Sequence, residues 1–299
     1  MTTPTSLTRI KVKNVLYLTD FSEPSEAALP YAAAIAREFG GKLYALHVLT
    51  PQPYVYSTPE TTVTAMEAQE EAAQEGMERA GAHLAGLVHE TIIENELGVW
   101  PAVERAIKEL KIDMIVVGTH GRSGIERLLL GSVAEEIFRR SPVPVLTIGP
   151  WAAAAVHNGA KFHRIVFATD FTKESLAAAP YAIALAQENQ SRLTLLHVMK
   201  ERSRKDGDKF GAISVADAMH SLLEIVPPEA ELWCRPEAAV QYGNPPEKIL
   251  EAAKDRGADL IVLGVRSATG HLGAATHVER ATAHNVVAHA QCPVLTVRG

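Results

Sequence analysis

At 299 residues, the chain is longer than a single hydrophobic core usually supports, so two domains are expected. Hydrophobic residues make up 47% and charged residues 21%, which excludes a disordered composition. The formal net charge of -6 provides no basic field for a phosphate backbone, which excludes nucleic acid as the main partner.

The cysteine content and the N-terminus favour the cytoplasm. The cysteines, Cys234 and Cys292, are too few for a disulfide framework or a CxxC site. Residues 1–13 lack the apolar core of a signal peptide, and no apolar run approaches the roughly 18 residues that cross a bilayer. We therefore expect a cytoplasmic protein with no membrane partner.

An internal repeat divides the chain into halves. Residues 14–49 align with 164–199 without a gap, and both stretches contain Thr-Asp-Phe, Pro-Tyr-Ala and Leu-His-Val. Both halves also end on Pro-Val-Leu-Thr. We expect two copies of one fold: a first domain over 1–149, a linker over 150–163 and a second domain over 164–299.

Each half alternates short apolar runs, typical of strands buried on both faces, with longer helical patterns. In chain order, the first half predicts strands over 14–18, 43–49, 91–96, 113–117 and 144–148, separated by helices over 24–39, 60–89, 101–110 and 132–140. Ser22 is the expected N-cap of the first helix, and Pro24 suits its first turn. The second half predicts strands near 164–168, 193–199, 231–240, 259–263 and 293–297.

This alternation indicates an α/β fold: two tandem doubly wound domains, each a five-stranded parallel sheet flanked by helices, of Rossmann-like type. In such a sheet, ligands bind at the carboxyl ends of the strands, where the strand order reverses. We therefore look for a binding site at that edge.

The best candidate is the loop that follows the fourth strand of the first half, which has the pattern G-x2-G-x9-G-S. Gly118 allows a sharp turn off the strand, and Gly121 permits a positive φ, so that backbone N–H groups can face an anion. Gly131 and Ser132 begin a helix whose positive end attracts phosphate, and Arg122 can add a charge-assisted bond. The alternative is that the glycines only make a tight strand-to-helix connection.

With this loop, the Thr19-Asp20-Phe21-Ser22 start and the Pro-Val-Leu finish, the chain resembles the universal stress protein family in its tandem form. The loop matches the signature of ATP-binding members at every position. The resemblance therefore implies that the first domain binds ATP or a related adenine nucleotide, with Mg or another divalent cation held through the phosphates.

The resemblance also implies where the nucleotide lies. Adenine and ribose are expected near the ends of the first two strands, and the ribose and phosphates along the loop. The implied contacts are Leu18, Thr19, Asp20, Val48, Val117, Gly118, Thr119, Gly121, Arg122, Gly131, Ser132 and Val133. For Asp20, the alternative is a local role, since an aspartate after a strand often bonds nearby N–H groups.

The second half departs from the signature at both ends of its loop. Ser267 replaces the second glycine, and Arg280-Ala281 replaces the Gly-Ser pair, with Thr282 as a possible cap of the helix there. We expect this second crevice to be empty, weakly occupied, or specialised for another ligand or partner.

The histidines favour structural roles. His47 and His197 occupy equivalent strand positions, where a hydrogen-bonded sheet histidine is expected. The four others that cluster in the second half are not spaced as metal ligands on one helical face: His271, His277, His284 and His289.

These observations favour a nucleotide-dependent stress-response regulator that acts through its binding state. No motif for a dedicated enzyme is found, so at most a slow ATPase activity is expected. An adenylyl-transfer enzyme and a ligand-independent dimerisation scaffold stay open as alternatives. The expected partners beyond the nucleotide are a second copy of the chain or the other domain, and an unknown protein.

Overall fold

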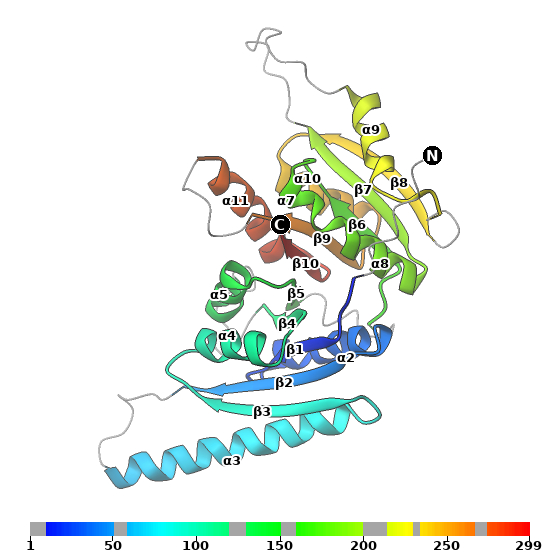
Figure 1. Ribbon diagram of the computed structural model, residues 1–299. Helices are drawn as coiled ribbons and strands as arrows, with labels where there is room; N and C mark the ends of the chain where they lie inside the picture. The colour runs from blue at the N-terminus through cyan, green and yellow to red at the C-terminus, as the bar shows by residue number, and fades with distance from the viewer. Residues whose placement is uncertain are drawn as a thin grey trace. The chain divides into compact units, whose positions relative to one another are not determined.

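The computed structural model describes residues 10–50, 59–119, 130–150, 160–199, 214–229, 234–266 and 274–299. The chain divides into two compact units, of which one is Lys11–Ala160 and the other contains Lys161–Gly299. Figure 1 labels most helices and strands of both units and colours the chain from blue at the N-terminus to red at the C-terminus. Each unit is an α/β structure, as the repeat predicts.

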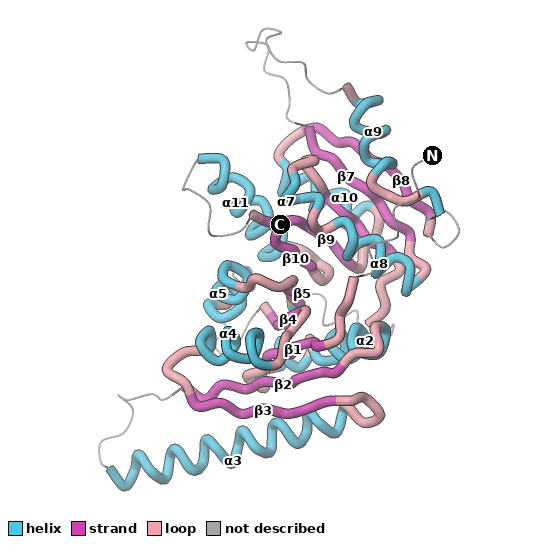
Figure 2. The backbone as a smooth tube through the Cα atoms, in the orientation of Figure 1, coloured by secondary structure: helices cyan, strands magenta, loops and turns pink. Residues whose placement is uncertain are grey.

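The first unit holds a five-stranded parallel sheet in the order β3-β2-β1-β4-β5. Figure 2 shows these strands in magenta with helices packed along them. Its elements are β1 (Asn14–Leu18), α1 (Glu23–Glu26), α2 (Leu29–Glu38), β2 (Lys42–Leu49), α3 (Pro59–His83), β3 (His89–Asn95), α4 (Val99–Glu109), β4 (Met114–Gly118), α5 (Ser132–Arg140) and β5 (Val145–Ile148).

The second unit repeats this topology, with strands paired in parallel in the order β8-β7-β6-β9-β10. Its elements are β6 (Arg164–Ala168), α7 (Lys173–Leu176), α8 (Ala179–Asn189), β7 (Arg192–Met199), α9 (Val215–Glu224), β8 (Arg235–Tyr242), α10 (Pro245–Asp255), β9 (Leu260–Val265), α11 (Ala274–His289) and β10 (Val294–Arg298). The predicted α/β class and the five-stranded sheets are thus confirmed.

The central strands carry the core of each unit. Every residue of β4 is buried, as are the last four of β1, because helices cover both faces of a parallel sheet. In the first unit the strand order reverses between β1 and β4, so the crevice for a ligand lies at their carboxyl ends.

Two predicted helices of the first unit differ in the structure. The helix expected over 24–39 is two helices, α1 and α2, because Pro30 lies in the first turn of α2 and has no N–H to continue a longer helix. Ser22 caps α1 as predicted, through a bond from the Ser25 N–H. The helix expected over 60–89 ends at His83, and Gly86 at φ 81° turns the chain into β3.

The last helix of the second unit also differs from the prediction. Its start was expected at the Arg280-Ala281 pair, yet α11 begins at Ala274. The stretch 274–281 holds neither glycine nor proline to stop the helix. Arg280 and Thr282 therefore lie inside α11, and Thr282 does not cap it.

Candidate functional site

A cavity of about 240 Å³ lies at the carboxyl ends of β1, β2 and β4, beside the starts of α4 and α5. It brings together ten residues that the sequence assigns to the site: Leu18, Thr19, Asp20, Val48, Val117, Gly118, Thr119, Gly131, Ser132 and Val133. Gly121 and Arg122 lie outside the described residues.

Five further residues line the same cavity and were not assigned to the site by the sequence: Ser25, Leu46, His47, Val99 and Ala134. Four of them lie close to assigned residues along the chain, so the motifs point to their neighbourhood. Val99 is different, because it comes from the start of α4, beyond the edge strand β3. The one sequence signal for it is Gly98, which forms the N-cap of α4.

The turn after β1 is held by hydrogen bonds and is locally strained. The Thr19 N–H donates to the Leu46 carbonyl at 3.0 Å, and the Phe21 N–H donates to Thr19 Oγ1 at 3.0 Å. Phe21 has φ 60°, a conformation uncommon for a bulky residue. The ring of Phe21 lies 4.4 Å from that of His47, centre to centre. These contacts hold Thr19 and Asp20 in place at the edge of the cavity.

Asp20 bonds nearby groups of the turn that follows β1. Its Oδ1 accepts from the Ser22 N–H at 3.0 Å and from Ser22 Oγ at 2.5 Å. Asp20 also lines the cavity. The local role in the turn and a role in binding are therefore compatible with its position.

His47 is buried and hydrogen-bonded to the backbone. Its Nδ1 lies 2.8 Å from the Thr19 carbonyl oxygen, so Nδ1–H is the donor of this bond. On the neighbouring strand β1, the Tyr17 hydroxyl donates to the Ser25 carbonyl at 2.9 Å. Burial raises the pKa of Tyr17 to about 12, so its hydroxyl stays protonated. His47 lines the cavity itself, and Tyr17 holds the backbone of Ser25, which also lines it.

Gly118 has a packing role that the sequence does not reveal. It is the last residue of β4 and is not among the residues at positive φ, and the predicted turn after it falls on residues 120–129, outside the described residues. A Cβ atom there would lie 2.6 Å from the Pro24 carbonyl oxygen. Glycine is therefore required because the backbone of α1 crosses β4 in direct contact.

The start of α5 lies at the cavity. Gly131 is the N-cap residue, with extended backbone at φ -61°, and its own N–H donates to the Thr119 carbonyl at 2.6 Å. It has no side chain to cap the helix, and Ser132, Val133 and Ala134 line the cavity. The N–H groups of a first helical turn have no partner within the helix, and together with the helix dipole they favour an anion.

Comparison with known proteins identifies the family. A family model described as "Universal stress protein family" matches the chain twice, over residues 11–149 and 161–298. The chain belongs to the universal stress protein family. The two matches account for both units, which confirms the tandem form that the repeat predicts.

Individual relatives agree. A universal stress protein of Methanocaldococcus jannaschii is 34% identical over 144 residues, which cover 46% of this chain and 81% of that protein. One of Mycolicibacterium smegmatis is 25% identical over 296 residues, with 95% of this chain and 96% of the relative covered. The crystal structure of a universal stress protein from Archaeoglobus fulgidus has a TM-score of 0.67 at 24% identity and covers 97% of this chain. At that identity, the match supports the fold alone.

The second universal stress protein unit repeats the frame of the first. His197 Nδ1 lies 2.9 Å from the Thr169 carbonyl, Phe171 has φ 65°, and Asp170 Oδ1 accepts from the Thr172 N–H at 3.0 Å. The pKa of Asp170 lies below its usual value. Burial alone would raise it, but the hydrogen bonds from Thr172 and Ser175 stabilise the carboxylate by more. A Cβ at Gly264 would collide with the backbone of α7, just as a Cβ at Gly118 would collide with the backbone of α1.

The two units differ at the helix that follows the fourth strand. In the first unit, Gly131 and Ser132 stand at the start of α5, whereas Arg280 and Ala281 lie within α11. Ser267 and His271 lie outside the described residues, and so do the side chains of His277 and Arg280. Of the other clustered histidines, His289 bonds through Nδ1 to the Asn285 carbonyl of its own helix at 2.8 Å.

Both cysteine thiols are buried, and burial raises the pKa of Cys234 to about 11 and of Cys292 to about 12. They therefore stay protonated at neutral pH and are poor nucleophiles.

Within the described part of the chain, no helix combines the length and the apolar character needed to span a membrane.

Proposed function

We propose that the first unit binds ATP at the β1/β4 crevice and that this universal stress protein acts in the cytoplasm as a nucleotide-dependent stress-response regulator. The observation that carries the proposal is the convergence of Asp20, Gly118, Gly131 and Ser132 on one cavity. These residues come from three separate segments, and they include the described part of the G-x2-G-x9-G-S signature.

The chemistry around the cavity suits the parts of a nucleotide. Apolar side chains of Leu18, Val48 and Val99 offer a surface for a base, and the Asp20 carboxylate can accept ribose hydroxyl or adenine amino hydrogens. The N–H groups at the start of α5 and the Ser132 hydroxyl suit phosphate oxygens. A divalent cation would be held through the phosphates and would neutralise part of their charge.

The proposed output is a binding state rather than a product. Among the described residues, no cluster of three or more His, Cys, Asp or Glu is arranged to hold a metal ion by itself. His47 lines the cavity, but its Nδ1 is engaged with the Thr19 carbonyl. We propose that bound ATP changes how the protein associates, either with a second copy of itself or with another protein.

The test is isothermal titration of the full chain with ATP in the presence of Mg²⁺, followed by the same titration of Gly131→Arg. The φ of -61° at Gly131 is accessible to arginine, so the substitution blocks the start of α5 without backbone strain. We expect Gly131→Arg to abolish binding, and Gly131→Ala, the matched control, to retain most of it. Equal affinity in all three proteins would overturn the assignment of the phosphate site.

A further inference from the structure

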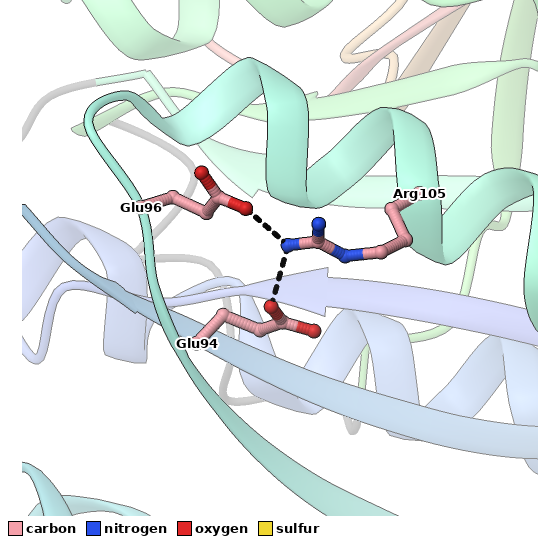
Figure 3. A network of polar contacts seen from close by, with 3 residues as sticks. All are labelled: Glu94, Glu96 and Arg105. Carbon is pink, nitrogen blue, oxygen red and sulfur yellow. Dashed lines mark hydrogen bonds and ion pairs between the residues drawn. The ribbon is translucent and has the colours of Figure 1, made fainter.

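A cluster of three charged side chains fixes the turn between β3 and α4 (Figure 3). Nη2 of Arg105, on α4, donates to Glu94 Oε2 at 2.7 Å and to Glu96 Oε1 at 2.5 Å. One nitrogen therefore bridges two carboxylates, one from the end of β3 and one from the turn. All three side chains are partly shielded, with 38%, 31% and 26% of Arg105, Glu94 and Glu96 exposed.

This turn delivers Val99 to the cavity. Val99 is the first residue of α4, three residues after Glu96. Leu97, between them, is 91% exposed, so its side chain does not anchor the turn in the core. Glu96 is held at its backbone by the Leu49 carbonyl, which its N–H meets at 3.1 Å. The Arg105 cluster adds the side-chain connection that ties the turn to the body of α4.

The other side of Val99 is anchored by Trp100, which is buried and packs beneath the guanidinium of Arg140 at 4.9 Å from the ring centre. Trp100 connects the start of α4 to α5, whereas Arg105 connects α4 to β3 and to the turn. Removing the Arg105 charge should therefore loosen one of the two anchors and shift Val99 without releasing α4.

The order of the strands places Val99 at one end of the proposed nucleotide site. Val99 follows β3, whereas Gly118 and Gly131 belong to the β4–α5 connection, and β2 and β1 lie between these two strands. With phosphates at the start of α5, the base reaches toward β2 and β3. Val99 thus lines the part of the cavity where the base is expected.

We propose that Arg105 is a positioning residue of the proposed nucleotide site: by bridging Glu94 and Glu96 it holds Val99 against the base. This inference rests on the proposed function. It is specific to the first unit, because the equivalent seventh residue of α10 is Glu251, which pairs with Lys248 of its own helix at 2.6 Å.

The test compares the two ends of the ligand separately. Adenosine, which has no phosphate, and inorganic triphosphate, which has no base, are titrated into the full-length chain and its variants. Arg105→Met should weaken adenosine binding about three- to tenfold, in line with coupling energies between neighbouring residues, and leave triphosphate binding unchanged. Lys108→Met is the matched control, since it removes the Glu104 ion pair of the same helix, away from the turn, and should alter neither affinity.

Two further variants exclude a merely structural role. Arg105→Lys should restore adenosine binding, because one ammonium can bridge the same two carboxylates. In a Val99→Ala background, Arg105→Met should have little additional effect, because the wall that it positions is already missing.

The outcomes separate this inference from the proposed function. If the unsubstituted chain binds neither ATP nor adenosine, the proposed function fails and the inference fails with it. If the unsubstituted chain binds and Arg105→Met lowers both affinities equally, or neither, the positioning role alone is wrong. If the losses of adenosine affinity caused by Arg105→Met and Val99→Ala add up fully in the double variant, Arg105 does not act through Val99.

Discussion

Nδ1 of His47 lies 2.8 Å from the carbonyl oxygen of Thr19, and the equivalent bond in the second unit joins His197 to Thr169 at 2.9 Å. Each histidine also lies against a phenylalanine at positive φ. Because the arrangement recurs in a unit that lacks the Gly-Ser helix start, it belongs to the fold. The difference between the units therefore lies in what is built on this shared frame.

The two histidine–carbonyl bonds predict that replacing either histidine lowers stability equally, but that only one replacement weakens ATP binding. His47→Ala and His197→Ala each leave a buried carbonyl without its donor and remove a packed ring, so each should cost about 2 kcal/mol of unfolding free energy. Chemical denaturation measures this for each variant. Only His47→Ala should also weaken ATP binding, because it lets the Thr19–Asp20 turn relax. Equal affinity losses in both variants would contradict the assignment of ATP to the first unit.

Comparing the aspartates that follow β1 and β6 distinguishes a role in the local turn from a role in ATP binding. Asp20→Ala and Asp170→Ala each remove an acceptor of the following turn, which should cost about 1 kcal/mol of stability. Titration with ATP should show weaker binding for Asp20→Ala and no change for Asp170→Ala. If Asp20→Ala loses stability but keeps its affinity, the carboxylate serves the turn alone.

The sequence predicts the sheets well because each buried strand is a continuous apolar run. β1 and β6 have the predicted bounds, and the others differ by a few residues at most. Ten assigned site residues gather around one cavity because parallel strands end at the same edge of a sheet. Their role in binding stays a prediction.

Other features depend on tertiary contacts that spacing does not reveal. The need for glycine at position 118 arises from the crossing of α1, which is distant in sequence. The start of α11 at Ala274 reflects an uninterrupted helix-forming stretch, although the loop alignment favoured a later start. The meeting of Arg105 with Glu94 and Glu96 likewise joins side chains of α4 to β3 and the turn after it, a contact that the sequence pattern does not reveal.

The lowered pKa of Asp170 predicts an acid-sensitive contribution to the second unit. Since its folded pKa lies below the ordinary value of about 3.9, the ionised form stabilises the fold at higher pH, and this contribution disappears as the pH falls through the folded pKa. Asp170→Asn should therefore reduce stability at pH 7 and converge with the unsubstituted protein in strong acid. Denaturation at a series of pH values measures the difference, and a constant gap at all pH values would contradict the prediction.

The last prediction concerns the glycines at which α1 and α7 cross their sheets. Gly118→Ala places a Cβ 2.6 Å from the Pro24 carbonyl oxygen, and Gly264→Ala meets the backbone of Glu174 and Ser175. Backbone atoms cannot move aside as a flexible side chain can, so each substitution should cost about 1–3 kcal/mol, the usual range for overpacking. Displacement of α1 should also move Ser25, which lines the cavity, so Gly118→Ala should weaken ATP binding and Gly264→Ala should not. Thermal denaturation and titration of the matched pair measure both effects, and full stability in either variant would show that the close crossing is absent in solution.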